Sequence, residues 1–106
     1  MNWIFLTDYS QISDALIKLE SFIVFKHSTR CSISRMVKDR FERNFDLTNV
    51  SVYYLDLLTY RLISDQLSID FDIEHQSPQL LFIKKGKCIY HASHNGINMK
   101  AIKDNM

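Results

Sequence analysis

The segment Phe22-Ile23-Val24-Phe25-Lys26-His27-Ser28-Thr29-Arg30-Cys31-Ser32 decides the fold. Its first four residues form an unbroken apolar run rich in β-formers, which is typical of a strand buried on both faces of a parallel sheet. The polar residues that follow this run indicate a loop. Apolar residues then recur at helical spacing and predict a helix over residues 32–45. The expected inner face of this helix consists of Ile33, Met36, Val37, Phe41 and Phe45.

On the N-terminal side of this unit, the sequence predicts one more strand and one more helix. Residues 3–6 have the composition of a short first strand. Ser10 is expected to be a helix N-cap, because a serine hydroxyl can accept a hydrogen bond from the first helical turn. The inner face of this helix is predicted from the spacing i, i+3, i+4 and i+7, which is that of Ile12, Ala15, Leu16 and Leu19.

On the C-terminal side, the alternation of strand and helix continues. Residues 50–55 predict a third strand, and Thr59 is expected to cap a third helix. The expected inner face of that helix consists of Leu62, Ile63 and Leu67.

The last third of the sequence predicts a hairpin and a short helix. Pro78 opens a strand over residues 79–83, and Lys84-Lys85-Gly86-Lys87 has the composition of a hairpin turn. A return strand over residues 88–91 and a helix over residues 97–103 complete the pattern.

The predicted order is β-α-β-α-β-α-β-β-α, which implies parallel crossovers followed by an antiparallel hairpin. We therefore expect an α/β protein with one domain over residues 1–106. A central mixed sheet of four or five strands would be flanked by about four helices, with the hairpin and a helix at the C-terminal side. By analogy, this order is that of a thioredoxin-like fold.

Composition and charge exclude several classes of protein. The 106 residues are 46% hydrophobic and 12% aromatic, and this content is incompatible with a disordered chain. The net charge of +1 gives no electrostatic basis for binding nucleic acid. No apolar run approaches the roughly 20 residues that span a bilayer, so no membrane association is expected. Residues 1–8 have no basic segment of the kind found in signal peptides, and we expect a cytoplasmic protein.

Cys31 is the residue best placed for chemistry. If the helix begins near Ser32, Cys31 lies at its N-cap or first position, where unpaired backbone N–H groups and the helix dipole stabilise a thiolate. Arg30 adds a neighbouring positive charge, and Ser34 can offer its hydroxyl or backbone N–H to the sulfur. Arg30, Ser32 and Ser34 are therefore the expected supporting residues. A loop cysteine without a role is the alternative that these residues leave open.

The nonapeptide Lys26-His27-Ser28-Thr29-Arg30-Cys31-Ser32-Ile33-Ser34 resembles the active-site segment of the monothiol bacilliredoxins. These are thioredoxin-fold proteins of low-GC Gram-positive bacteria that use bacillithiol. The resemblance covers nearly the whole chain and includes Tyr54-Leu55-Asp56 and Glu74-His75-Gln76-Ser77-Pro78-Gln79. The usual family site reads Cys-Pro-Ile-Ser, whereas this chain has Ser32 at the second position. The nucleophile is retained, and the missing proline is expected to loosen the first helical turn slightly.

The resemblance implies a thiol–disulfide oxidoreductase that removes bacillithiol from S-bacillithiolated client proteins through Cys31. Ser34 stands where a Cys-x-x-Cys pair has its second cysteine, so no disulfide can form within this motif. Cys31 would take over the small thiol, and bacillithiol or another redoxin would release it. Bacillithiol would therefore be a co-substrate, and no tightly bound cofactor is expected.

The resemblance also assigns Pro78 to the site. Thioredoxin-fold proteins place a cis-proline opposite the cysteine, and the preceding residue, here Ser77, offers its backbone to an extended substrate. We therefore expect a cis Ser77–Pro78 bond and substrate contacts from both residues, although a proline that merely opens a strand is an equally good explanation. His27 either helps to position the substrate or packs beside the strand.

Cys88 is not expected to resolve a disulfide at Cys31. The predicted hairpin carries it to the far end of the sheet, roughly 15–20 Å from Cys31, whereas a disulfide needs Cα atoms within about 7 Å. The spacing of Cys88, His91 and His94 suits a helix, and on a strand Cys88 and His91 would point to opposite faces. We therefore expect no metal site at these residues or at His75, which is near them in the sequence.

Two other functions stay open. One is a thioredoxin-fold adaptor that binds protein partners without using Cys31. The other is an iron–sulfur protein of the monothiol glutaredoxin kind, in which two Cys31 thiolates and two small thiols share a cluster.

Overall fold

Strand β2 (Ser21–His27) lies at the centre of the protein, whose computed structural model describes residues 1–106. The observed order of strands and helices is the one that the sequence predicts. The remaining elements are β1 (Trp3–Phe5), α1 (Ser10–Lys18), α2 (Ser32–Asn44), β3 (Ser51–Asp56), α3 (Arg61–Phe71), β4 (Gln79–Lys84), β5 (Lys87–Ser93), the 3-10 turn η1 (His94–Gly96) and α4 (Met99–Asp104).

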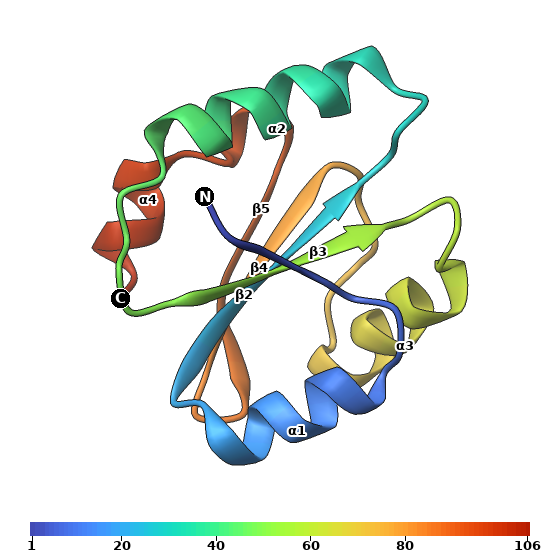
Figure 1. Cartoon of the computed structure of the whole chain (residues 1–106), viewed down its shortest axis with the longest axis vertical. Helices are drawn as coiled ribbons and strands as arrows, with labels where there is room; N and C mark the ends of the chain where they lie inside the picture. Colours follow the sequence, from blue (N-terminus) through green and yellow to red (C-terminus); the bar gives the residue numbers. More distant parts are fainter.

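The five strands form one mixed sheet in the order β1-β3-β2-β4-β5 (Figure 1). Strands β1, β3 and β2 are parallel, whereas β4 and β5 are antiparallel to their neighbours. The C-terminal ends of β1, β3 and β2 therefore meet the N-terminal end of β4 at one edge. The loop that carries Cys31 leaves the sheet at this edge.

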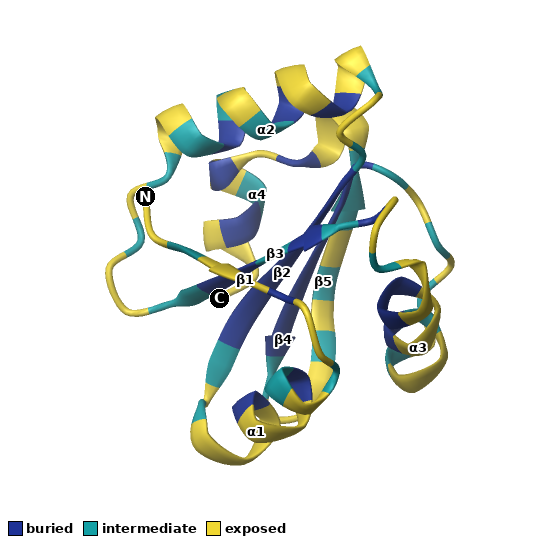
Figure 2. Ribbon diagram, turned by 45° about the vertical axis from the view of Figure 1, so that its right-hand side comes forward, coloured by how far each residue is buried: buried dark blue, intermediate teal, exposed yellow.

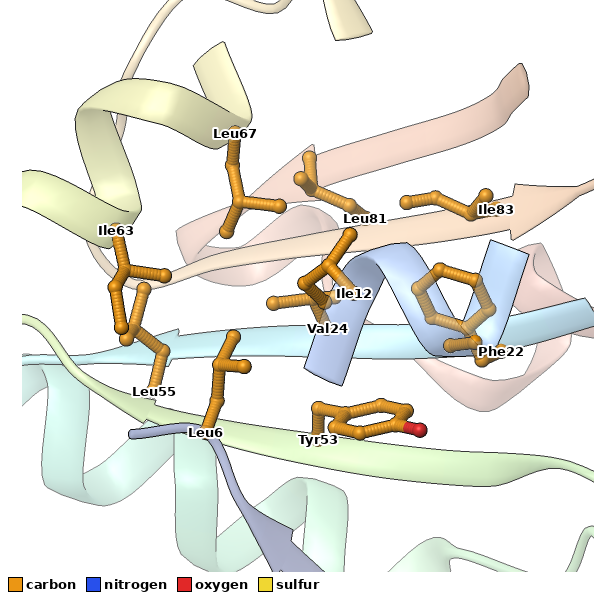
Figure 3. Packing of buried hydrophobic residues seen from close by; sticks show 11 residues of the cluster. Leu6, Ile12, Phe22, Val24, Tyr53, Leu55, Ile63, Leu67, Leu81 and Ile83 are labelled. Atoms are coloured by element: carbon orange, nitrogen blue, oxygen red, sulfur yellow. The ribbon is translucent and has the colours of Figure 1, made fainter. Parts of the chain in front are cut away.

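Helices cover both faces of the sheet, with α1 and α3 on one face and α2 and α4 on the other (Figure 1). Strands β2 and β4 are buried along nearly their whole length, whereas the helices turn exposed faces outward (Figure 2). The core under α1 and α3 contains Leu6, Ile12, Ala15, Phe22, Val24, Tyr53, Leu55, Ile63, Leu67, Leu81 and Ile83 (Figure 3). The core under α2 and α4 contains Ile23, Phe25, Val37, Phe41, Val52, Leu80, Phe82, Ile97, Met99 and Ile102.

The predicted doubly buried strand is confirmed, and its side chains alternate between the two cores. Phe22 and Val24 pack under α1 and α3, while Ile23 and Phe25 pack under α2 and α4. The strand continues past the apolar run through Lys26 and His27, which pair with β3 and are buried as well. The segment that the sequence assigns to a loop therefore begins two residues later, at Ser28.

The two predicted helix caps are wrong. The residue before α1 is Tyr9, and Ser10 is already helical; its N–H donates to a carboxylate oxygen of Asp8 at 2.8 Å. The residue before α3 is Tyr60, and the Thr59 hydroxyl donates to Asp56 at 2.9 Å. Both predicted caps therefore donate a hydrogen bond to a preceding aspartate, and neither side chain accepts one from the first helical turn.

The predicted inner faces of the helices are only partly right. Leu16, Ile33, Met36 and Leu62 are exposed, with Leu62 83% accessible. The buried stripe of α2 is Ser34, Val37 and Phe41, and that of α3 is Ile63, Ser64 and Leu67. A small serine occupies a buried position in each stripe, so a search for apolar spacing alone centres the face on the wrong residues.

The hairpin turn between β4 and β5 needs left-handed backbone at two positions. Lys85 has φ of 52° and Gly86 has φ of 81°, which is the pattern of the two-residue turns that fit twisted strands. Glycine adopts this conformation without the steric cost of a Cβ atom.

Gly86→Ala is expected to destabilise the protein by about 1 kcal/mol, because a Cβ atom is unfavourable at positive φ. The surrounding space is open, so no clash adds to this strain. Chemical denaturation measures the loss. The turn lies at the far end of the sheet from Cys31, and the rate of Cys31 alkylation should not change; an altered rate would contradict this separation.

Candidate functional site

Cys31 is the N-cap of α2, as the sequence predicts. Its backbone is extended, with φ of −103° and ψ of 120°, and its side chain is half-buried. Its N–H donates to Ser28 O at 3.2 Å, and its carbonyl oxygen accepts from Arg35 N at 3.1 Å. The thiol is therefore attached where the first helical N–H groups and the positive end of the helix dipole favour an anion.

Ser34 lies in the first turn of α2 and is fully buried. Its Oγ accepts from Ser28 N at 3.1 Å and is 2.7 Å from His27 Nδ1. No hydrogen bond joins Ser34 to the Cys31 sulfur, and support of a Cys31 thiolate by Ser34 stays a prediction. The hydroxyl instead holds the turn that leads to Cys31.

His27 ends β2 and is only 4% exposed. Its ring packs beside Tyr54, with 5.8 Å between the ring centroids, and its Nδ1 faces Ser34. Burial lowers the pKa of His27 below its ordinary value; Lys38 and Arg35 act in the same direction, against Asp56 and Asp39. The ring packs beside the sheet, as one of the two predictions for His27 states, and a role in positioning the substrate stays a prediction.

Arg30 and Ser32 flank Cys31, and both are exposed. Arg35, one helical turn later, is exposed as well. The accessible surface around the thiol therefore carries two cations and a hydroxyl.

The Ser77–Pro78 peptide bond is cis, which confirms the prediction. Pro78 is buried, and because Gln79 pairs with Lys26, the bond lies at the same edge of the sheet as the Cys31 loop. The carbonyl oxygen of Pro78 accepts from His94 N at 3.3 Å. The Ser77 hydroxyl oxygen is buried and has no hydrogen-bond partner.

Gln79 was missed by the sequence analysis. Its buried amide donates to Glu74 O at 2.9 Å and accepts from Gln76 N at 3.3 Å. The side chain thus braces the loop that carries Ser77. The available signal was a glutamine next to the proline, at the start of a strand that is otherwise apolar.

Lys26 was missed too, and it is fully buried beneath α3. Its Nζ lies 3.4 Å from Ser64 O, 3.4 Å from Ser68 Oγ and 3.5 Å from His75 Nδ1. Burial lowers the pKa of Lys26 to about 8, although Asp65 opposes the shift. The amine therefore ties β2 to α3 and to the segment before Ser77. The available signal was the unbroken continuation of a buried strand into a charged residue.

Cys88 lies at the opposite end of the sheet from Cys31, as predicted. It pairs with Ile83 on β4, and Ile83 pairs with Phe22 near the start of β2, whereas Cys31 follows the end of that strand. Both cysteines are free. Burial raises the pKa of the half-buried Cys88 thiol, which lies 3.3 Å from Tyr90 O.

The prediction that Cys88 and His91 point to opposite faces is wrong. A bulge shifts the register between Phe82 and Ile83, so Cys88 pairs with Ile83 and His91 pairs with Leu81. Ile83 and Leu81 belong to the same core, and paired residues share a face. Even so, no group of three or more histidine, cysteine, aspartate or glutamate residues is arranged to hold a metal ion.

A half-buried thiol at a helix N-cap and a cis-proline at the same edge of a mixed sheet define a thioredoxin-fold oxidoreductase. A family model described as Monothiol bacilliredoxin BrxC matches residues 4–102. The chain therefore belongs to the monothiol bacilliredoxin family.

Solved structures share this fold. The chain is similar to a candidate oxidoreductase with a thioredoxin fold, with a TM-score of 0.87, 25% identity, and coverage of 97% of this chain and 92% of the other. It is also similar to the thioredoxin of Trypanosoma brucei brucei, with a TM-score of 0.77, 12% identity, and coverage of 98% and 87%. A mutant thioredoxin from Halobacterium salinarum gives a TM-score of 0.75 at 13% identity, with coverage of 97% and 86%.

The helices of the protein are all too short or too polar to cross a membrane.

The buried amine of Lys26 makes stability depend on pH. Above about pH 8 the folded protein releases this proton, whereas the unfolded chain keeps it up to the ordinary pKa of 10.5. The free energy of unfolding of the wild type should therefore rise relative to that of Lys26→Met, by about 2 kcal/mol between roughly pH 7 and 10. Urea denaturation of both proteins across this range measures the difference. If the difference in free energy of unfolding between the two proteins does not change with pH, the amine has the same pKa in the folded and unfolded states, and the prediction is wrong.

Proposed function

We propose that this protein removes bacillithiol from protein mixed disulfides by thiol–disulfide exchange at Cys31. One observation carries the proposal. Cys31 is half-buried at the N-cap of α2, and the position three residues later, where a Cys-x-x-Cys motif has its second thiol, is occupied by the buried Ser34. This arrangement supports a nucleophile at Cys31 and leaves no partner for it in its own motif.

The exchange conserves electrons among the sulfur atoms. The Cys31 thiolate attacks the bacillithiol sulfur of the mixed disulfide, a new S–S bond forms at Cys31, and the client sulfur leaves as a thiolate that takes a proton from solvent. The client cysteine is reduced and Cys31 is oxidised. A second bacillithiol, or the thiol of another redoxin, then attacks the bacillithiol sulfur of this disulfide. The new S–S bond joins the attacking sulfur to bacillithiol, which leaves as the oxidised product, and Cys31 leaves as the thiolate.

This cycle needs no tightly bound cofactor. Bacillithiol acts as co-substrate, S-bacillithiolated proteins are the clients, and the reducing cytoplasm is the compartment that supplies free thiols. Arg30 and Arg35 are the cations nearest in sequence to the thiol, and we assign them to the carboxylates of bacillithiol. Ser77 and Pro78 would take the client peptide, with the backbone N–H and C=O groups of Ser77 offered to an extended substrate.

Transfer of the small thiol onto Cys31 tests the proposal. A bacillithiolated client protein is mixed with the Cys88→Ser variant, and intact-protein mass spectrometry follows both chains. The variant should gain one bacillithiol on Cys31 while the client loses it. The matched Cys31→Ser, Cys88→Ser variant should gain none and should be within roughly 1 kcal/mol of the same stability, because serine is itself a good N-cap.

Absence of transfer from a client that dithiothreitol readily reduces would contradict the proposal. That outcome would favour an adaptor that binds partners without using Cys31. Transfer in the wild type that required Cys88 would contradict the role assigned to Cys31.

Ser34→Cys should convert the site to a dithiol one. The introduced thiol lies three residues after Cys31 on the first helical turn, which is the spacing of a closable pair. Under mild oxidation the variant should acquire an intramolecular disulfide, seen as a loss of both free thiols in the Cys88→Ser background. Two free thiols after oxidation would refute the inference that only the missing sulfur prevents an internal disulfide.

A further inference from the structure

The buried pair formed by His27 and Ser34 lies directly beneath the turn that presents Cys31. His27 is the last residue of β2, and Ser34 is in the first turn of α2. Both side chains are buried, and the distance between Nδ1 and Oγ is 2.7 Å. A polar pair this short in a buried place fixes two elements relative to each other.

We propose that His27 is a positioning residue for the thiol chemistry of Cys31 and that it acts through the hydroxyl of Ser34. The inference deepens the proposed function, since it concerns the same thiol. His27 makes no hydrogen bond to the Cys31 sulfur and is not assigned a step in the exchange. Its role is to hold the Ser28–Cys31 turn against α2, so that the thiol stays at the helix N-cap.

The hydrogen bonds around Ser34 have a definite direction when neutral His27 carries its proton on Nε2. The Ser28 N–H donates to Ser34 Oγ at 3.1 Å and occupies one lone pair. The hydroxyl proton of Ser34 is then free to donate to the unprotonated Nδ1 of His27. One hydroxyl therefore links the end of β2, the start of the turn and the first turn of α2.

The surroundings of His27 favour its neutral form. Burial has the largest effect, and the cations Lys38 and Arg35 on α2 outweigh the carboxylates of Asp56 on β3 and Asp39 on α2. The ring of Tyr54 packs on the β3 side, and the backbone oxygen of His27 accepts from Leu57 N at 2.9 Å. These contacts leave Ser34 as the side chain that hydrogen-bonds the imidazole.

Protonation would disturb this arrangement. A proton on Nδ1 turns the imidazole into a donor to the second lone pair of the Ser34 oxygen, so the Ser34 hydroxyl proton loses its buried acceptor. Because the pKa of His27 is lowered from 6.5, the change falls in more acidic solution than for an ordinary histidine. The reactivity of Cys31 should therefore show an inflection below pH 6.5 that follows the protonation of His27.

The test measures the alkylation of Cys31 by iodoacetamide from about pH 5 to 8, in the Cys88→Ser background. His27→Phe, Ser34→Ala and their double variant are compared with the parent. Each single variant should react about three- to tenfold more slowly near pH 7, the range that one net hydrogen bond supplies. The double variant should react no more slowly than the single ones, because the pair acts as a unit.

The pH profile separates positioning from general loosening of the fold. The parent should show the additional inflection below pH 6.5, and His27→Phe and Ser34→Ala should both lack it. His91→Phe, a matched change at an exposed histidine of β5, should keep both the rate and the inflection. Thermal unfolding identifies any variant that fails to fold; Ser34→Ala removes a single oxygen and can stand in for His27→Phe.

Three results would overturn the inference. They are unchanged rates in both single variants, rate losses that multiply in the double variant, and an inflection that survives in Ser34→Ala. The assay uses no bacillithiol, so a failure of small-thiol transfer leaves this result readable. Conversely, normal alkylation profiles in these variants would leave transfer by Cys31 standing without a role for His27.

Discussion

The burial of β2 on both faces is the constraint on which the rest of the structure depends. Its alternating side chains supply both cores, so the helices on either face are placed relative to this one strand. β2 also pairs with β3 on one side and with β4 on the other. The cysteine turn and the cis-proline, which come from distant parts of the sequence, are thereby brought to one edge of the sheet.

Lys26 and His27 extend β2, and each hydrogen-bonds to a helix on a different face of the sheet. Lys26 points toward α3 and the segment before Ser77, whereas His27 points toward α2 and Ser34. Neighbouring positions on a strand face opposite ways, so the pair divides its contacts between the two sides of the sheet. The turn that carries Cys31 and the segment before Ser77 are thus both anchored to β2.

The sequence was sufficient for the features that depend on local pattern. The run from Phe22 to Phe25, the N-cap position of Cys31 and the Lys85-Gly86 turn each have a short-range signature. Three features depend on tertiary geometry and could not be foreseen. The rotation of α2 decides that Ser34 meets His27, and the burial of Lys26 depends on α3. The bulge in β5 opposite Phe82 and Ile83 places Cys88 and His91 on the same face, which a regular strand would not do.

The distance between the two cysteines along the sheet, together with Ser34 at the adjacent helical position, has a kinetic consequence. A mixed disulfide formed at Cys31 cannot be resolved by a cysteine of the same chain, because Cys88 lies at the opposite end of the sheet. Its lifetime is then governed by collision with thiols from solution, and it lengthens as that pool is depleted. The fraction of the protein that carries a mixed disulfide at Cys31 would therefore report the supply of free thiols. No mutation of a second cysteine would be needed to accumulate this mixed disulfide.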